Sequence, residues 1–126
     1  MTTSSAENKA RAQDFLRFAR QGNREAAQRL IADGARHHNP YFRAGMPALL
    51  DAIVAAAQAS TDHGIAIKHV LADGDYVAVH SHVRHRSEDP GVAVVHLFRF
   101  EDGQIAELWD IGQAIPAENP NSDGMF

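Results

Sequence analysis

The spacing of hydrophobic residues divides the chain into a helical first half and a β second half. Apolar side chains recur three or four positions apart over residues 6–20, 24–32 and 47–59, as one face of an α-helix requires. Ser5 and Asn23 stand just before the first two of these segments and are suited to cap them. The pattern therefore predicts three helices before the first long strand.

Beyond residue 64 the spacing changes to alternation, which is typical of β-strands with one buried face. Asp-Gly pairs at 73–74 and 102–103 are strong turn signals between successive strands. A further extended segment or brief strand is expected at 35–39, because Pro40 biases the residue before it away from the helical conformation. Four longer strands are expected in an antiparallel meander, at residues 65–71, 76–86, 92–100 and 105–113.

Helices and strands that are segregated along the chain indicate the α+β class, with three N-terminal helices packed on an antiparallel sheet. A length of 126 residues suits a single domain, spanning 1–126. The last two strands are apolar on both faces, so the face turned away from the helices needs a cover. A second copy of the chain is the simplest cover, and we expect a homodimer through Trp109, Leu97 and Ile111.

The composition is that of an ordinary globular protein, with 44% hydrophobic and 22% charged residues. A formal net charge of −4 and the lack of a basic run argue against nucleic-acid binding. The absence of cysteine excludes a cysteine nucleophile, a disulfide and an iron–sulfur cluster. No apolar run approaches the ~20 residues that span a membrane, and the N-terminal residues lack the apolar core of a signal peptide, so we expect a cytoplasmic protein.

Two polar residues interrupt the apolar hairpin formed by residues 94–113. If Asp102-Gly103 is its turn, a register that joins Phe98 to Leu108 also joins His96 to Asp110 on the same face. An imidazole opposite a carboxylate in an apolar wall indicates acid–base chemistry or a metal site. We expect Asp110 to act as general base or acid, with His96 orienting it, sharing its proton or polarising a substrate oxygen.

The alternative role for Asp110 is structural, as a carboxylate paired with Arg84 or Arg99 or with the backbone. His80 and His82 share one face of their strand, and a turn at 87–91 that pairs His82 with His96 would bring both into the same cavity. Their spacing also suits metal chelation, but three fixed ligands need more than one such pair, so no metal is expected. A metal site formed by some combination of His38, His80, His82, His96 and Asp110 is the less favoured alternative. The expected substrate contacts are His38, His80, His82, Phe98 and Tyr41.

Four motifs resemble a known family. HHNP (37–40), ADGDYVAVHSHV (72–83), FRFEDGQIAELWD (98–110) and NPNSDGMF (119–126) are similar to the SnoaL-like polyketide cyclase or predicted aldol-condensation group of the nuclear transport factor two-like superfamily. The resemblance extends over nearly the whole chain. It implies a single SnoaL-like domain with a cone-shaped α+β barrel, in which the antiparallel sheet is curved.

The resemblance also implies an activity. In the polyketide cyclases of this family an Asp on the last strand is the acid–base residue and a His lies on the strand before it, and Asp110 and His96 match those positions. The implied reaction is a cofactor-free intramolecular aldol condensation or isomerisation of a small, apolar carbonyl compound. Many relatives of the closer group carry Asp where this chain has His96. The superfamily also includes non-catalytic modules, so a small-molecule-binding dimer is the alternative.

Overall fold

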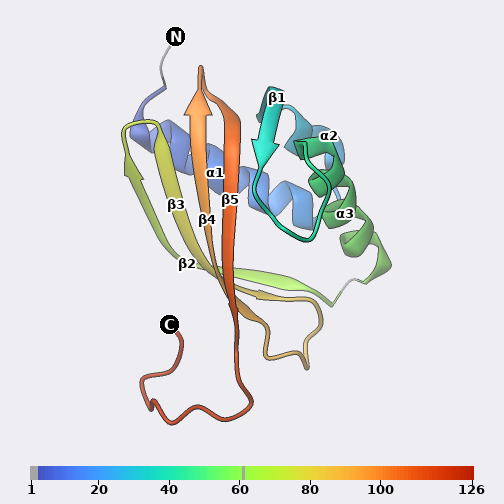
Figure 1. The fold of residues 1–126 in the computed structure, drawn as a ribbon, viewed down its shortest axis with the longest axis vertical. Helices are drawn as coiled ribbons and strands as arrows, with labels where there is room; N and C mark the ends of the chain where they lie inside the picture. The colour runs from blue at the N-terminus through green and yellow to red at the C-terminus, as the bar shows by residue number, and fades with distance from the viewer. Residues whose placement is uncertain (1–2, 61) are drawn as a thin grey trace.

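Three helices pack against one face of a five-stranded sheet in the computed structural model, which describes residues 3–60 and 62–126 (Figure 1). This arrangement confirms the α+β class. The helices are α1 (Ser5–Arg20), α2 (Arg24–Gln28) and α3 (Met46–Ala59), and the strands are β1 (Ile31–His37), β2 (Gly64–Asp73), β3 (Tyr76–Arg84), β4 (Val92–Glu101) and β5 (Gln104–Ala114). None of the helices in the described part of the chain is long and apolar enough to cross a membrane.

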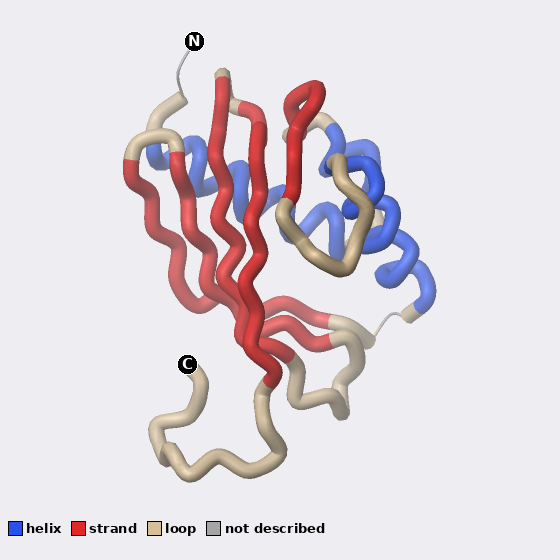
Figure 2. Tube along the Cα trace, viewed as in Figure 1, coloured by secondary structure: helices blue, strands red, loops and turns tan. Residues whose placement is uncertain are grey.

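The sheet is mixed, with strand order β1-β5-β4-β3-β2. The four long strands form the predicted antiparallel meander, and β1 is added to its edge in parallel with β5. Figure 2 shows that the strands bend, so that one end of the sheet turns beneath the helices. This curvature separates part of the sheet from α3 and leaves room for a cavity.

The predicted helix over 24–32 is wrong beyond Gln28, because the chain enters β1 at Ile31. Leu30 and Ile31 fit helical spacing, but pairing with β5 satisfies backbone groups that would otherwise be exposed at the edge of the sheet. The N-cap of α2 is Asn23, as predicted. The N-cap of α1 is Ser4 rather than Ser5, because Ser4 forms a reciprocal capping box with Glu7.

The β4–β5 hairpin has the predicted turn and register. Asp102 and Gly103 both have positive φ, of 50° and 79°, as a two-residue type I′ turn requires. Beyond the turn, β4 and β5 pair His96 with Asp110 as predicted. The hairpin therefore places the imidazole and the carboxylate opposite each other on one face of the sheet.

A bulge in β5 changes which residues face the helices. The register shifts between Arg99 and Phe100, and Ala106 is the extra residue on β5. Ile105 consequently pairs with Phe100 and is fully buried in the core, whereas simple alternation placed it on the outer face. Trp109 lies after the bulge and keeps its predicted place on the face opposite Asp110.

The predicted register between β3 and β4 is wrong. His96 pairs with Val79, not with His82, and His82 pairs with Ala93. The observed partner of His96 is three residues away from the expected one. Because successive side chains alternate between the two faces, a shift by an odd number places His80 and His82 on the outer face. The observed register buries apolar residues instead, since Val77 and Val79 are fully buried.

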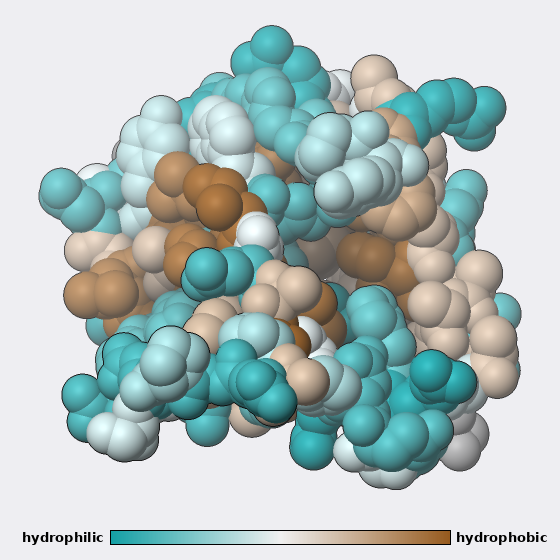
Figure 3. All heavy atoms as spheres, turned by 60° about the horizontal axis from the view of Figure 1, so that its bottom comes forward, coloured by the Kyte–Doolittle hydropathy of each residue, from teal (hydrophilic) through white to brown (hydrophobic). Residues whose placement is uncertain are grey.

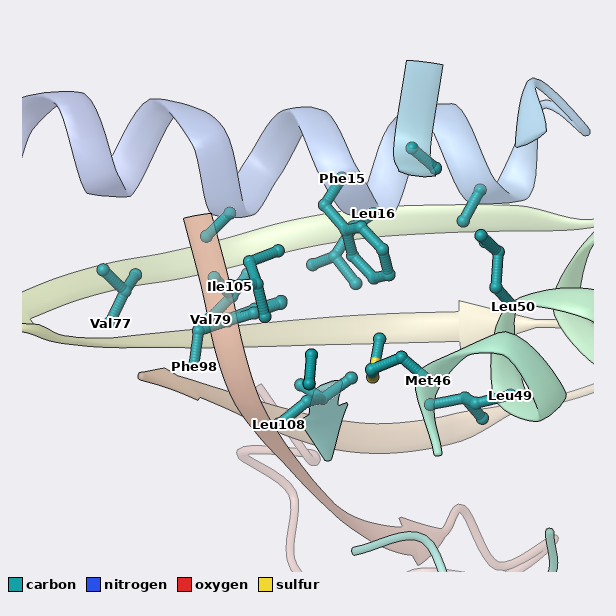
Figure 4. Packing of buried hydrophobic residues seen from close by; sticks show 14 of the residues in the cluster. Phe15, Leu16, Met46, Leu49, Leu50, Val77, Val79, Phe98, Ile105 and Leu108 are labelled. Atoms are coloured by element: carbon teal, nitrogen blue, oxygen red, sulfur yellow. The ribbon is translucent and has the colours of Figure 1, made fainter. Parts of the chain in front are cut away.

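The core lies between α1, α3 and the inner face of the sheet (Figure 4). Phe15 and Leu16 of α1 and Leu49 of α3 project toward the strands, and the rings of Phe15 and Phe98 meet edge to face at 6.0 Å. Each fully buried side chain of this size contributes about 1.5–3 kcal/mol. The rigid base formed by this core lies directly beside the inner end of the cavity.

Candidate functional site

A cavity of about 900 Å³ lies between α3 and the curved end of the sheet. Its walls are mostly apolar, with Leu49 and Ile53 from α3 facing Val92 and Val94 from β4. Figure 3 shows a hollow on this side of the molecule, with apolar atoms inside and hydrophilic residues around it. A concave, largely apolar space with a few polar groups is the usual form of a small-molecule site.

Three polar side chains meet at the narrow inner end of this cavity. Arg20 is the last residue of α1, His96 lies on β4 and Asp110 lies on β5. Each of the three also lines the wider part of the cavity. The site therefore combines a cation, an imidazole and a carboxylate at the base of an apolar space.

Asp110 is held by an amide from the loop that follows β1. The Nδ2 atom of Asn39 donates a hydrogen bond of 2.9 Å to Oδ2 of Asp110. Asn39 is fixed in turn, because its Oδ1 accepts from the backbone N–H of Tyr41 and its own N–H donates to Nδ1 of His37. Asn39 belongs to the HHNP motif, but no local pattern in the sequence indicates its contact with Asp110.

His96 is buried and uncharged at neutral pH. Burial, assisted by the positive charge of Arg20, lowers the pKa of His96 to about 3. Its Nδ1 atom is buried and has no hydrogen-bond partner within the described residues. A neutral imidazole with an unused ring nitrogen can donate or accept one hydrogen bond, so His96 can contact a substrate oxygen but does not carry a second proton.

Arg20 was missed by the sequence analysis. Arg20 is a basic residue in the last turn of α1, a position that usually only stabilises the C-terminal end of a helix. Its Nε atom is instead buried at the cavity without a hydrogen-bond partner among the described residues. Burial lowers the pKa of Arg20, and the negative charge of Asp110 opposes that effect.

The structure does not bring His38 into the cavity. Its imidazole lies on the outer side of the sheet, where Nε2 is 2.6 Å from Oε2 of Glu107 and the ring stacks on Trp109 at 5.0 Å. Arg99, one of the two arginines considered as partners of Asp110, also binds Glu107 on that side. The other, Arg84, is exposed at the end of β3.

The remaining predicted contacts are dispersed. His80 and His82 lie on the outer face, where both rings are close to Phe126 of the C-terminal tail. Phe98 is fully buried in the core and does not line the cavity. Tyr41 does line it, at the rim, with 87% of its surface exposed.

The alternative metal site is not assembled. The sheet separates His38, His80 and His82 from the pair formed by His96 and Asp110. Within residues 3–60 and 62–126, no three His, Cys, Asp or Glu side chains are grouped so as to hold a metal ion.

Solved structures with this fold come from several bacteria. A proposed ketosteroid isomerase from Kribbella flavida shares 18% identity, with a TM-score of 0.73 over 94% of this chain and 87% of that one. A proposed polyketide cyclase from Sinorhizobium meliloti shares 22% identity, with a TM-score of 0.68 over 81% of this chain and 94% of that one. An NTF2-like protein of unknown function from Cytophaga hutchinsonii shares 15% identity, with a TM-score of 0.70 over 90% and 95% of the two chains.

These similarities confirm the predicted NTF2-like fold, since each extends over most of both chains. No curated protein shows significant similarity to the chain. Residues 12–108 match the family model described as SnoaL-like domain. The match covers well over half of the sequence, and the chain therefore belongs to the SnoaL-like domain family.

Proposed function

We propose that this protein is an acid–base enzyme that removes a proton from a carbon next to a carbonyl group, with Asp110 as the proton acceptor. The observation that carries the proposal is the position of Asp110 at the inner end of an apolar cavity, opposite His96 and bonded to Asn39. Carboxylates are seldom kept in apolar surroundings without a role, because desolvation is costly. Solved structures described as a proposed ketosteroid isomerase and a proposed polyketide cyclase support the same class of reaction.

The proposed step transfers one proton and leaves an enolate. Asp110 takes the proton, the electron pair of the C–H bond forms a C=C bond, and the carbonyl π pair moves onto oxygen. Return of the proton at another carbon completes an isomerisation. Attack of the enolate carbon on a second carbonyl completes an intramolecular aldol closure. Neither outcome requires an electron acceptor or donor.

The cavity favours a rigid, mainly apolar substrate. Its volume of about 900 Å³ lies in the range typical of drug-sized ligands. The alanine residues of α3 that line it, such as Ala52 and Ala56, leave a smooth wall with no hydrogen-bonding groups. A fused ring skeleton could pack against this wall. The carbonyl that reacts would then lie at the polar inner end of the cavity.

Deuterium exchange tests this proposal without knowledge of the natural product. The protein is incubated in D₂O with β,γ-unsaturated ketosteroids and with aromatic 1,3-diketones, and loss of the acidic C–H signal is followed by NMR. We expect catalysed exchange with at least one compound, and a fall of about 10²–10⁴-fold in the Asp110→Asn variant. The matched control is Glu107→Gln, which removes a carboxylate from the opposite face of the sheet and should change the rate by less than about threefold.

Two results would contradict the proposal. The first is an undiminished exchange rate in Asp110→Asn while circular dichroism shows a native fold. The second is tight binding of these compounds by the wild-type protein with no exchange above the rate in buffer. That second result would favour the non-catalytic binding module.

A further inference from the structure

Arg20 is the only positively charged side chain at the inner end of the cavity within the described residues. The other groups there are His96, Asp110 and apolar side chains from α1, α3 and β5. Its Nε atom is buried without a hydrogen-bond partner in the described part of the chain. An arginine in such a place has donors available for a bound molecule.

Burying a guanidinium without a close partner is unfavourable, so the position of Arg20 needs an explanation. Other arginines of the chain form short ion pairs, such as Arg24 with Asp51 at 2.8 Å. The ion pairs found between described residues include none between Arg20 and Asp110, although the charge of Asp110 acts on Arg20. Arg20 therefore lies near the negative charge of Asp110 but keeps an unused hydrogen-bond donor.

The cavity is positively charged although the protein is negatively charged. Among its lining residues that are ionised at neutral pH, Arg20 and Arg86 outnumber the single Asp110, which gives a net charge of +1. The whole chain has a formal net charge of −4. A cavity whose sign opposes that of the protein favours a negatively charged ligand or intermediate.

We propose that Arg20 is the oxyanion-binding residue of this site, and that the substrate is a ketone or 1,3-dicarbonyl compound whose carbonyl oxygen lies against its guanidinium. The inference rests on the proposed proton abstraction by Asp110. As the proton moves, the negative charge leaves the carboxylate and appears on the enolate oxygen. The guanidinium of Arg20 can then interact with the enolate oxygen in place of the Asp110 carboxylate, without changing its position.

This exchange of partners would lower the barrier rather than only tighten binding. A neutral carbonyl attracts the guanidinium weakly, and an enolate oxygen attracts it strongly, so the interaction grows as the transition state is approached. Apolar side chains surround the narrow end of the cavity, and their low polarity strengthens such a contact. His96 is the second group that can reach the oxygen, but it acts as a neutral donor.

Binding of 2-naphthol, whose phenolate mimics an enolate, tests this role without turnover. The Asp110→Asn variant reproduces the charge of the site after proton transfer, so it is the background for the measurement. Absorbance and fluorescence distinguish bound naphthol from bound naphtholate. We expect the Asp110→Asn protein to bind naphtholate at least tenfold more tightly than the double variant Asp110→Asn, Arg20→Met.

Two further variants make the result specific. Arg20→Lys in the same background keeps the charge and should retain part of the preference for naphtholate. Arg17→Met removes an exposed cation of the same helix that does not line the cavity, and should change the preference by less than about threefold. Circular dichroism of every variant checks that the fold is kept.

The inference is overturned if the fraction of bound naphtholate is the same with Met as with Arg at position 20, or if the Asp110→Asn protein binds neither form at millimolar concentration. Failure of the proposed function is a separate result. Preferential naphtholate binding that depends on Arg20, in a protein that catalyses no deuterium exchange, supports the anion site and contradicts the enzyme.

Discussion

The two faces of the sheet each hold a carboxylate, a histidine and arginine, yet the two clusters are built in opposite ways. On the outer face Glu107 is bonded by His38 and Arg99, and the hydrogen bond with His38 holds the pKa of Glu107 below its ordinary value against the effect of burial. The outer cluster comprises Glu107, His38, Arg99 and Arg36, and the inner cluster comprises Asp110, His96 and Arg20.

The inner cluster leaves hydrogen-bonding groups unused. Nδ1 of His96 and Nε of Arg20 are buried without a partner among the described residues. Polar groups that are buried and fully bonded stabilise a fold, whereas those left unbonded weaken it unless a ligand completes them. Residue types alone therefore do not identify a functional site, because both faces carry the same types. Only the inner face has unsatisfied hydrogen-bonding groups at a cavity.

The largest expected effect is on the free energy of unfolding, which should depend on pH because His96 is buried in its neutral form. Its pKa is about 3 in the folded state and about 6.5 in an unfolded chain, so between these values only the unfolded state binds the proton. Stability must therefore fall as the pH drops through this window. We expect the free energy of unfolding of the wild type to lose about 2–3 kcal/mol more than that of His96→Gln between pH 7.5 and pH 4.5.

Urea denaturation of both proteins at the two pH values measures this effect. The comparison uses the change with pH within each protein, so a uniform cost of placing Gln at position 96 does not matter. Parallel pH profiles for the wild type and His96→Gln would show that His96 is not kept neutral by the fold.

A smaller effect is expected from the amide that holds Asp110. Asn39→Ala removes the 2.9 Å hydrogen bond to the carboxylate and leaves the carboxylate itself in place. We expect the deuterium exchange rate to fall about tenfold, which corresponds to about 1.4 kcal/mol, with little change in substrate affinity. Asn119→Ala, in the exposed C-terminal tail, is the control, and an equal loss in both variants would deny Asn39 any role in positioning Asp110.

The outer cluster should respond in stability rather than in rate. Glu107→Gln removes the charge that binds His38 and Arg99, and we expect the Tm to fall by about 4 °C while deuterium exchange continues. Glu101→Gln is a matched control, because Glu101 also pairs with Arg99 but is exposed. A Tm unchanged in Glu107→Gln would mean that hydrogen bonding on this face does not stabilise the sheet.

A substitution in the apolar part of the outer face should have the smallest effect on the deuterium exchange rate. Ile111 is 66% exposed there, and we propose that a second copy of the chain covers it. Light scattering should report a dimer for the wild type and a monomer for Ile111→Lys, with an exchange rate per chain within about twofold of the wild type. A monomeric wild type at micromolar concentration would refute the dimer.

The hairpin that carries the site could be predicted from sequence because its determinants are local. Asp102-Gly103 fixes the turn, and the turn together with the one-residue bulge at Ala106 fixes the pairing of His96 with Asp110. The β3–β4 register could not be predicted in the same way, since the loop between Arg84 and Val92 is long enough to allow several registers.

The rest of the inner cluster depends on contacts between distant segments. Asn39 reaches Asp110 only because β1 pairs with β5, and Arg20 reaches it only because α1 crosses the same face of the sheet. Neither residue carries a local signal of this role. His38 was preferred to His37 because Asn39-Pro40 fixes the chain just after it, but His38 lies on the outer side of the sheet, where it bonds Glu107.

The extra residue at Ala106 has a consequence for comparing members of the family. It lets one strand direct both Ile105 and Asp110 inward although they are five positions apart, an odd spacing that uninterrupted alternation forbids. A relative with one residue fewer at this place needs no bulge, because regular alternation then still sets its aspartate opposite the equivalent of His96. A relative of the same length that lacked the bulge would instead present the equivalent of Trp109 to the cavity and its aspartate to the outer face. The match between chain length and bulge in this short stretch, together with the aspartate itself, therefore decides whether a relative can share the chemistry.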